Sequence, residues 1–577
     1  MGTRSSAAAL FVIALAVFAL ESLVLPAQHG RDMGRYVQTY VQLGYDEPVL
    51  PSVLNTRGPI AALGVGLPLE LGGTAAEVWL AFLYAGSIVA WGAVASIFGA
   101  RAVLATAAVL LAYPGYAILF HGLAGDTLFA AAFAGWAFVL SRAMLAPSIP
   151  TFLAAGAGMG ALVLVRPSNQ ALIVFALLPL LLRAPWGRRL AWASAFFIAS
   201  VALSQGWKAI AALLWGDAVA LRPTAAALGV ALLLLPLLFA GVWRRRAAMV
   251  AVPLVVALVA VRAATVDDPI QYARSSAQAP PLNVFLFRAF VTDRTVSPEN
   301  GPASRQLATV VRRDLLAEEP YRSYGIDLDE FFSSGSERVF ADLQSLGGSA
   351  DLEAVTREAI QRHPGTFARS IAETFWDLVW TRRIFASAGD TASERGSSGG
   401  AGETVVVDGR RLPRPTGGEP IPASRVGPNV WTRGGAAREV WRSATDHPLV
   451  FDDARDARRY ARFERDTNRL ASRLPTREGN DGLIHRLNQA SRAFPPPVVW
   501  LVVGLIALAI RRPARAFIAV VPAVAAVVVI GVTSLVALAV PEYAAPVSPA
   551  FILLAAVGLA GAHPRGVPAR WRRAWRH

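Results

Sequence analysis

The sequence predicts an α-helical polytopic membrane protein with about twelve transmembrane helices and one largely α-helical soluble domain on its outer face. Two observations on composition and one on charge predict this class. Of the 577 residues, 54% are hydrophobic and only 16% are charged, too few to cover the surface of a soluble chain of this length. The apolar residues gather in long runs. One segment, residues 264–494, instead carries 31 acidic and 31 basic residues.

Twelve apolar runs are candidates for transmembrane helices, because about 20 apolar residues are needed to cross the hydrocarbon core. The first run lacks a clear cleavage site of small residues, so we expect a retained anchor instead of a signal peptide. The runs are residues 7–25, 74–98, 101–119, 124–142, 150–165, 169–183, 189–209, 224–242, 246–263, 496–510, 514–540 and 547–562.

The basic residues outside segment 264–494 predict the orientation of these helices. With twelve spans, 17 of them fall on the side of the two termini and seven on the opposite side. Because cytoplasmic loops are enriched in Arg and Lys, we expect both termini in the cytoplasm and a location in a bacterial-type plasma membrane. These loops account for the whole net charge of +15, which argues against a nucleic-acid partner.

The chain divides into three predicted regions. Residues 1–263 form an N-terminal transmembrane module with a first outer loop at 26–73. Residues 264–494 form the extracytoplasmic soluble domain, in which frequent Gly, Ser and Pro predict a mobile loop at 386–428. Residues 495–577 supply three closing helices and a basic cytoplasmic tail.

Four further segments have helical patterns. In the first outer loop, Met33–Leu43 is amphipathic and Pro59–Leu71 is apolar, and each suits a helix at the membrane interface. In the soluble domain, helical periodicity runs through residues 352–380. Residues 450–474 alternate in charge sign, which predicts a solvated helix.

The acidic residues outside the soluble domain fall on one side in this topology. All nine lie at the outer face or at the outer end of a span. Acids contribute little to setting orientation, so this asymmetry indicates binding or chemistry at the outer surface. The chain has no cysteine, which excludes disulfides, thiolate metal sites and a cysteine nucleophile. The nine acids are Glu21, Asp32, Asp46, Glu47, Glu70, Glu77, Asp126, Asp217 and Glu542.

Asp32 follows the first span by a few residues, at the depth of lipid headgroups. A carboxylate at this depth suits a general base that accepts the proton of an acceptor hydroxyl. The alternative is an ion pair with Arg31 or Arg35 that anchors the next helix. Tyr36, one residue further on, is a candidate supporting group beside the same site.

Two arginines are candidates for binding a phosphate at the same face. Arg57 precedes Gly58 and Pro59, where the proline predicts the start of a helix. A guanidinium at a helix entrance near the membrane surface can hold a phosphate through two hydrogen bonds, and the alternative is an interfacial arginine that reaches into the headgroups. Arg166 occupies the outer end of the fifth span.

Asp126 opens the fourth span, where an acid either caps the helix or completes an acceptor or metal site with Asp32. His121 precedes it and is more often a buried polar residue than a ligand. Glu542 and Tyr543 lie in the last outer loop. Acids and arginines from separate loops thus meet one face of the membrane, which favours a polar site there.

The ordered set of these elements resembles a known family. The elements are Asp32 after the first span, Arg57-Gly58-Pro59-Ile60, Tyr113-Pro114 followed by Asp126, Leu164-Val165-Arg166-Pro167, and Tyr543 followed by Pro546 and Pro549, with a helix at 359–365 in the soluble domain. Together they resemble the GT-C superfamily of polytopic glycosyltransferases, in the branch of the protein O-mannosyltransferases and the lipid A aminoarabinose transferases. This sequence departs from the pattern in having a single Asp32 instead of an acidic pair, and Glu542 where many relatives have a basic residue.

The resemblance implies a polyprenyl-phosphate-linked sugar as donor and a hydroxyl of an envelope glycan, lipid or protein as acceptor. It implies Asp32 and Asp126 as catalytic residues, and Arg57 and Arg166 as ligands of the donor phosphate. The resemblance leaves open whether a divalent cation also binds the donor phosphate and whether the protein requires a metal. The supporting residues on the acceptor side would be Arg35, Tyr36, His121, Glu542 and Tyr543. The reaction implied is a single displacement that inverts the anomeric carbon.

Two other functions remain open from the sequence. Twelve spans with both termini inside also suit a transporter, although the charges of a transporter are expected near the bilayer midplane. A non-catalytic envelope scaffold with the same architecture is the second alternative. Convergence of Asp32, Asp126 and Arg57 on one place would favour an enzyme over both.

Overall fold

The computed structural model describes most of the helical chain. It covers residues 3–45, 58–215, 285–336, 350–381, 453–476, 481–513, 515–536 and 540–561, with short pieces at 230–231, 234–235, 339–340, 342–343, 346, 404–407, 410–413, 438–439 and 449–451. Statements below concern these residues.

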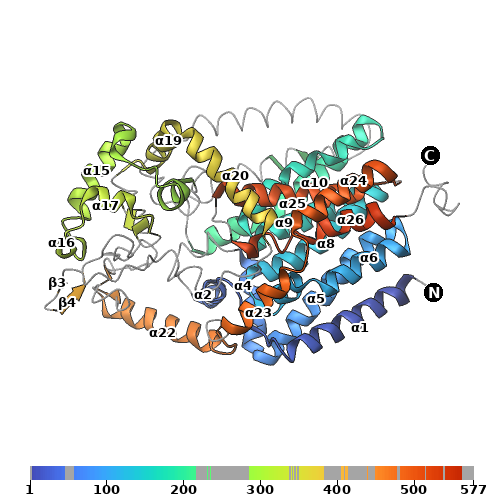
Figure 1. The fold of residues 1–577 in the computed structure, drawn as a ribbon, viewed down its shortest axis with the longest axis horizontal. Helices are drawn as coiled ribbons and strands as arrows, with labels where there is room; N and C mark the ends of the chain where they lie inside the picture. Colours follow the sequence, from blue (N-terminus) through green and yellow to red (C-terminus); the bar gives the residue numbers. More distant parts are fainter. Residues whose placement is uncertain are drawn as a thin grey trace.

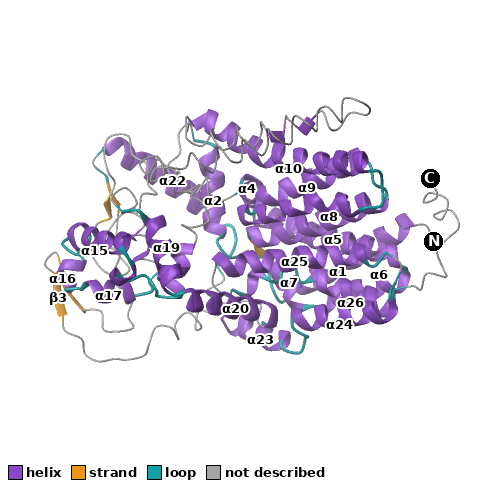
Figure 2. Cartoon of the chain, turned by 90° about the horizontal axis from the view of Figure 1, so that it is seen from above, coloured by secondary structure: helices purple, strands orange, loops and turns teal. Residues whose placement is uncertain are grey.

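The molecule has two parts, a long helical bundle and a smaller helical outer part at one end of it (Figure 1). Helix α1 begins, and α26 ends, at the end of the bundle that faces away from the outer part. Seen from above, the bundle helices lie side by side along one direction (Figure 2). The bundle comprises α1 (Thr3–Ser22), α5 (Gly73–Ala95), α6 (Ala100–Ala112), α7 (Pro114–Phe120), α8 (Gly125–Leu145), α9 (Ile149–Val165), the 3₁₀ helix η2 (Pro167–Leu181), α10 (Trp186–Trp215), α24 (Pro497–Arg511), α25 (Phe517–Val536) and α26 (Pro549–Ala560).

Prolines set several helix starts in the bundle. Pro59, Pro114, Pro497 and Pro549 each occupy the first turn of a helix, where the missing N–H removes no intrahelical hydrogen bond. Between α6 and α7, Pro114 ends one helix and starts the next at an angle of 65°. The run predicted at 101–119 is therefore one bent pair of helices.

The core of the bundle is built around large aromatic side chains. Phe133 of α8 packs against Trp91 of α5 with ring centroids 6.0 Å apart and against Trp136 at 5.7 Å, and all three rings are buried. The opposite faces of the helices stay apolar where they are exposed, for example at Leu104 (71% exposed) and Ile510 (76%). Such exposed apolar side chains are typical of a surface that meets lipid.

The twelve predicted spans are not confirmed. Ten of the predicted runs are helical, and the runs 224–242 and 246–263 lie outside the described residues except for two short pieces. Five described helices are long and apolar enough to cross a membrane, or six if the bent pair is one span. The remaining apolar α-helices, with 12 to 17 residues, reach only about 18–26 Å at 1.5 Å per residue, short of a ~30 Å core. The 15 residues of the 3₁₀ helix η2 reach about 30 Å at 2.0 Å per residue.

The outer part is mainly helical, as the sequence predicts, and has its own core. Phe290 packs against Phe331 and Phe332, and Tyr321 completes this buried aromatic group. Its helical elements are η5 (Arg288–Thr292), η6 (Pro298–Asn300), α15 (Pro302–Asp314), α16 (Tyr321–Tyr324), α17 (Leu328–Ser333), α19 (Leu352–Arg362), α20 (Pro364–Trp380), α22 (Ala454–Ala471) and α23 (Asp481–Ser491).

Three predictions about the outer part need correction or restriction. The helix expected over 352–380 is two helices, α19 and α20, because Pro364 cannot continue α19. The charged helix α22 is not solvated all round, since Phe463 and Leu470 are buried. Most of the predicted mobile loop 386–428 lies outside the described residues; within it, β3 (Thr404–Val407) and β4 (Arg410–Pro413) pair antiparallel.

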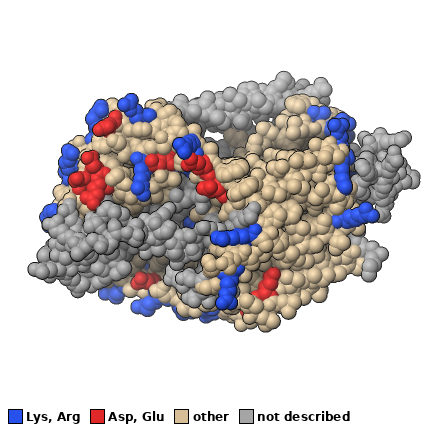
Figure 3. Space-filling model, in the orientation of Figure 1, with Lys and Arg blue, Asp and Glu red and all other residues tan. Residues whose placement is uncertain are grey.

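Charge divides the surface in the same way as the fold. On the face in Figure 3, a broad band without charged side chains covers the bundle, acidic and basic residues gather over the outer part, and basic residues stand at the far end. This arrangement is the one expected of a bundle whose middle lies in a bilayer.

Candidate functional site

The first outer loop is held against the corner between α7 and α8. Its strand β1 (Gln28–His29) pairs in parallel with β2 (Gly122–Leu123), and the N–H of Gly30 donates to the carbonyl of Leu123 at 3.1 Å. A Cβ on Gly30 would lie 2.6 Å from the Cβ of Ala124, so only glycine allows this approach. The next two residues, Arg31 and Asp32, are thereby brought to the start of α8.

Asp32 has a left-handed backbone, with φ 58° and ψ 14°. Few residues other than glycine adopt this conformation, although Asp tolerates it better than most. Asp32 precedes helix α2 (Met33–Leu43), yet its carboxylate makes no capping hydrogen bond to that helix. The side chain is exposed. Strained positions of this kind concentrate at functional sites.

Asp126 pairs with Arg166. The Oδ1 atom of Asp126, in the first turn of α8, lies 2.9 Å from Nη1 of Arg166, which directly follows α9. The two side chains are only 10% and 16% exposed. Ala124 holds the N-cap position itself, and Asp126 lies in the first turn of α8, where an anion interacts favourably with the helix N-terminus.

The ring of Tyr543 lies close to two guanidinium groups. It belongs to the 3₁₀ turn η9 (Pro541–Tyr543), which leads from α25 toward α26. The Cζ atom of Arg166 lies 4.5 Å from the centre of its ring, and that of Arg31 lies 5.2 Å from the same centre. Both contacts have the geometry of cation–π interactions. The last outer loop and the first outer loop therefore meet on one tyrosine.

The charges of this region act on one another. Burial lowers the pKa of Arg31, and Tyr543, Glu542, Asp32 and Asp126 more than offset it, so the pKa is raised. The pKa of Arg166 is raised in the same way: burial lowers it, and Asp126, Tyr543, Tyr36 and Asp32 outweigh burial. We call the group Arg31, Asp32, Asp126, Arg166, Glu542 and Tyr543 the outer cluster.

The outer cluster draws on four separate places in the sequence. Glu542 is 3% exposed and interacts electrostatically with Arg31. Tyr36 is buried, and its ring lies directly against Gly125 at the start of α8. Both were predicted as supporting residues; Glu542 belongs to the cluster and Tyr36 lies beside it.

His121 and Arg35 are placed differently from the cluster residues. His121 is fully buried and stacks on Phe18, with ring centroids 4.1 Å apart, and its Nε2 lies 3.5 Å from a carboxylate oxygen of Glu21. His121 is therefore buried outside the cluster, and its supporting role stays a prediction. Arg35 is exposed on α2, and its carbonyl accepts a hydrogen bond from Thr39.

Arg57 lies outside the described residues. Its neighbour Gly58 is described and packs so closely on the carbonyl of Leu164 that a Cβ could not be accommodated. Leu164 is two residues before Arg166, so Gly58, at the start of α4 (Pro59–Leu71), is fixed beside the end of α9.

Arg31 is the residue of the cluster that the sequence did not predict as a site residue. It was considered only as an ion-pair partner of Asp32. Its position next to Asp32 in the sequence could have identified Arg31 as a candidate site residue. Its contact with the ring of Tyr543, which is 512 positions away, has no counterpart in the sequence pattern.

The outer part is seated on the loop that carries Arg31 and Asp32. Nε2 of His29 lies 2.7 Å from the carbonyl oxygen of Ala471, and the N–H of His29 donates to the carbonyl of Pro475 at 2.9 Å. Arg473 donates to the carbonyls of Leu69 and Glu70 in α4 at 2.7 and 2.9 Å. The end of α22 thus fixes both helices of the first outer loop.

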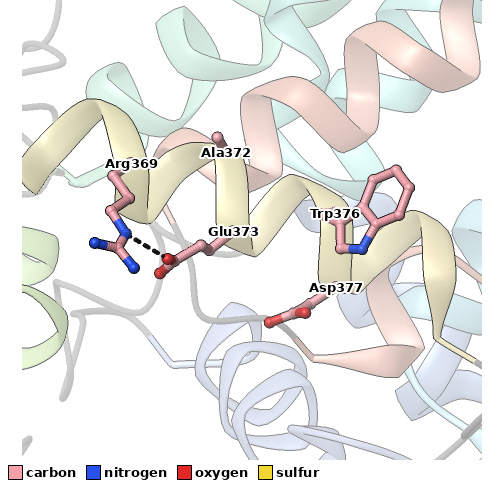
Figure 4. A pocket seen from close by; sticks show the side chains of 5 residues that line it. All are labelled: Arg369, Ala372, Glu373, Trp376 and Asp377. Atoms are coloured by element: carbon pink, nitrogen blue, oxygen red, sulfur yellow. Dashed lines mark hydrogen bonds and ion pairs between the residues drawn. The ribbon is translucent and has the colours of Figure 1, made fainter.

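A surface hollow of about 560 Å³ lies elsewhere. All the residues that line it, which include Arg369, Glu373 and Trp376, come from one helix, α20 (Figure 4). None of these residues belongs to the outer cluster, so the hollow is separate from the candidate site. Within the described residues, no group of three or more His, Asp and Glu side chains is placed to hold a metal ion.

No family model and no curated protein matches this sequence. Two solved structures are similar to it, both of ArnT from Cupriavidus metallidurans. The crystal structure bound to undecaprenyl phosphate shares 16% identity, covers 66% of this chain and 81% of its own, and has a TM-score of 0.29. For the apo state these values are 17%, 65%, 80% and 0.28. Such TM-scores are too low for the likeness to carry an argument about function.

Proposed function

We propose that this protein is a membrane glycosyltransferase that moves a sugar from a polyprenyl-phosphate donor to an acceptor hydroxyl at the outer face of the membrane. The observation that carries the proposal is the outer cluster: two guanidinium groups share the ring of Tyr543, and Asp126 and Asp32 lie within electrostatic range of both. The resemblance of the ordered sequence elements to GT-C enzymes supports the same reaction.

The arginines are suited to the leaving phosphate. When the bond between C1 of the sugar and the phosphate oxygen breaks, negative charge grows on that phosphate. Arg166 is oriented by Asp126 and by the ring of Tyr543, so its guanidinium needs little rearrangement to stabilise this charge. Arg31 supplies a second guanidinium on the same ring. Arg57 remains a predicted ligand of the same phosphate.

Asp32 is suited to activate the acceptor. Its carboxylate is exposed and is not used to cap α2. In the proposed step, Asp32 takes the proton of the acceptor hydroxyl as that oxygen attacks C1 from the side opposite the phosphate. One C–O bond forms while another breaks, so the anomeric configuration inverts. Asp126 is proposed to hold Arg166 in place and to support the acceptor side.

The charge of the cluster sets a requirement for the donor. Asp32, Asp126 and Glu542 carry three formal negative charges, against two positive charges on Arg31 and Arg166. An anionic phosphate would therefore enter a region with one negative charge in excess. A further cation is needed beside it, and Arg57, Arg35 or a divalent cation is proposed for that role.

The proposed location follows from the same arrangement. The cluster includes the residue before α2, and α2 lies where the bundle meets the outer part, away from the start of α1 and the end of α26 (Figure 1). With the termini proposed to be cytoplasmic, the cluster is proposed to lie at the outer leaflet of a bacterial-type plasma membrane. A transporter site is expected near the middle of its bundle, so the position of the cluster favours an enzyme.

The test is transfer of label in lipid bilayers. Purified protein is incubated with a panel of polyprenyl-phosphate sugars that carry ¹⁴C in the sugar, and envelope membranes serve as acceptor. We expect one donor to label glycan, lipid or protein, and we expect Asp32→Asn to lower the rate by about 10²–10⁴-fold, as for the loss of a general base.

Asp329→Asn is the matched control, because Asp329 is an exposed carboxylate on α17 with no part in the cluster. It should leave the rate unchanged. Donor binding by Asp32→Asn, measured separately, should persist because the arginines are intact. Transfer by Asp32→Asn at the rate of the unchanged protein would show that another residue is the base. Absence of transfer from every donor would contradict the proposed reaction itself.

A further inference from the structure

Helix α20 joins the outer part to the bundle. Near its start, Phe367 packs against Phe285 of the outer part, with ring centroids 5.7 Å apart. Near its end, Leu378 and Val379 are buried in the same apolar core as the bundle helices, and Phe375 packs against that core. The helix contacts both α24 and α25. Its two halves therefore lie in different surroundings.

A buried arginine fixes the level of α20 along the bundle. Arg288, 1% exposed, donates to Ser370 Oγ at 2.6 Å, to Thr374 Oγ1 at 3.0 Å and to the carbonyl of Ser534. Ser534 is two residues before the end of α25. Thr374 is thus level with the outer end of a helix that is long and apolar enough to cross a membrane.

The exposed face of α20 changes character at this level. Before it, Arg369 and Glu373 form an exposed ion pair at 2.8 Å, with side chains 80% and 61% exposed. After it, Trp376 and Trp380 are 54% and 45% exposed and stack with centroids 5.4 Å apart. Figure 4 shows Trp376 on the helix beyond the pair Arg369 and Glu373. At 1.5 Å per residue, the two tryptophans lie about 3 and 9 Å further along the axis than Thr374.

We propose that the last turns of α20 lie in the headgroup layer of the outer leaflet, with Trp376 and Trp380 as anchors and the pair Arg369–Glu373 in water. Tryptophan is enriched at this layer because its ring is apolar while its N–H needs a polar partner. Helix α20 contacts α24, which exposes the apolar side chains Val502 (47%) and Ile506 (55%).

The occupant of this surface is lipid because of its position. Trp376 comes two residues after Thr374, which is level with the last turn of α25. On the other side of α20, Leu378 and Val379 belong to the bundle core. A binding face for a soluble partner would be expected to expose large apolar side chains on the water side of Thr374, where the large exposed side chains are those of the charged pair Arg369 and Glu373. Asp377 is exposed between the two tryptophans, at the level assigned to the headgroups, where a carboxylate can still reach water. The bilayer surface is therefore assigned to the short stretch between Glu373 and Trp376.

The absence of cysteine from the sequence makes this surface directly testable. Three variants, Arg369→Cys, Trp376→Cys and Trp380→Cys, each carry a single cysteine. Each variant is spin-labelled and placed in vesicles of phosphatidylethanolamine and phosphatidylglycerol. Collisions with oxygen, which concentrates in lipid, are compared with collisions with a water-soluble nickel chelate. We expect the ratio of oxygen to nickel collisions to rise from 369 through 376 to 380.

Val502→Cys on α24 provides the lipid-exposed reference. Asp377→Cys keeps both tryptophans and samples the same depth, so the result does not depend on a variant that lacks an anchor. Nickel collisions at 376, 377 and 380 as frequent as at 369 would place the helix in water and overturn the proposal. Exclusion of both reagents at these sites would show that protein covers them, which overturns it as well. The measurement is independent of sugar transfer.

Discussion

Arg166 has two partners of different kinds, the carboxylate of Asp126 at 2.9 Å and the ring of Tyr543 at 4.5 Å. Both fix the plane of the guanidinium, which is the property that a phosphate ligand needs. The carboxylate also compensates a positive charge that is only 16% exposed. Loss of either charge leaves the other uncompensated in a largely buried place.

We therefore predict strong coupling between Asp126 and Arg166. Asp126→Asn and Arg166→Gln should each lower the free energy of unfolding by about 3 kcal/mol, because each removes the opposite charge 2.9 Å from a largely buried one. The double variant should lose clearly less than the sum of the two. Unfolding in mixed micelles with increasing denaturing detergent measures this double-mutant cycle.

The exposed pair Arg369–Glu373 provides the comparison for that cycle. Its side chains are 80% and 61% exposed, so removing both charges should show little coupling. If the coupling between Asp126 and Arg166 proved no larger than in this exposed pair, the carboxylate would not be what holds Arg166 in place.

At this scale, the sequence predicted residue types well and contacts poorly. Asp126, Arg166 and Tyr543 were each expected at the outer face, because each stands at the end of an apolar run. That Arg166 and Arg31 share the ring of Tyr543 depends on how α9, α25 and the first outer loop pack, and a pattern along the chain carries no such information.

At the scale of elements, helix α15 begins against a carboxylate from a neighbouring helix. Glu358 of α19 accepts hydrogen bonds from the N–H of Ala303 at 2.9 Å and from the N–H and hydroxyl of Ser304 at 2.8 and 2.7 Å. These are donors of the first turn, which has no intrahelical acceptors. An acid at a helix N-terminus also interacts favourably with the helix dipole.

This contact predicts a pH-dependent contribution to stability. Burial raises the pKa of Glu358, but the hydrogen bonds from Ser304 and Ala303 lower it more, so the pKa is below its ordinary value. Because the folded-state pKa is depressed, the ionised carboxylate stabilises the fold at pH values above the ordinary pKa of about 4.3. This stabilisation is lost as the pH falls through the folded-state pKa. Glu358→Gln should thus lower the Tm at pH 7, and the difference should shrink below about pH 4.

Thermal unfolding of the purified protein at several pH values measures the difference. Glu373→Gln is the control, since the ion pair of Glu373 with Arg369 on α20 is exposed and its loss should change the Tm little. An equal effect of Glu358→Gln at pH 7 and below pH 4 would mean that the carboxylate charge does not support α15.

Element boundaries were predictable where periodicity and proline agree. Met33–Leu43 and Pro59–Leu71 are confirmed as α2 and α4 with those bounds. The break at Pro364 could have been predicted from the proline alone. The buried face of α22 could not, because Phe463 and Leu470 are covered by packing on the first outer loop, which the charge pattern does not reveal.

At the scale of the whole molecule, the ends of the bundle differ in kind. One end carries the outer part and the outer cluster, and the other has the start of α1, the turn before α6 and the end of α24, where Arg511 donates to the carbonyl of Leu559. The alternation of basic loops predicted this polarity from the sequence. The number of spans was harder to predict, because short apolar helices and full spans have similar compositions.

The polarity of the bundle gives a prediction about orientation in the membrane. Glu464 is exposed on α22, and Arg101 is exposed near the start of α6 at the opposite end of the bundle. In this cysteine-free chain, Glu464→Cys should react with a membrane-impermeant maleimide in intact spheroplasts, because α22 is expected outside. Arg101→Cys should react only after permeabilisation. The reverse pattern would put the outer cluster at the cytoplasmic leaflet, where the proposed acceptors of the envelope are out of reach.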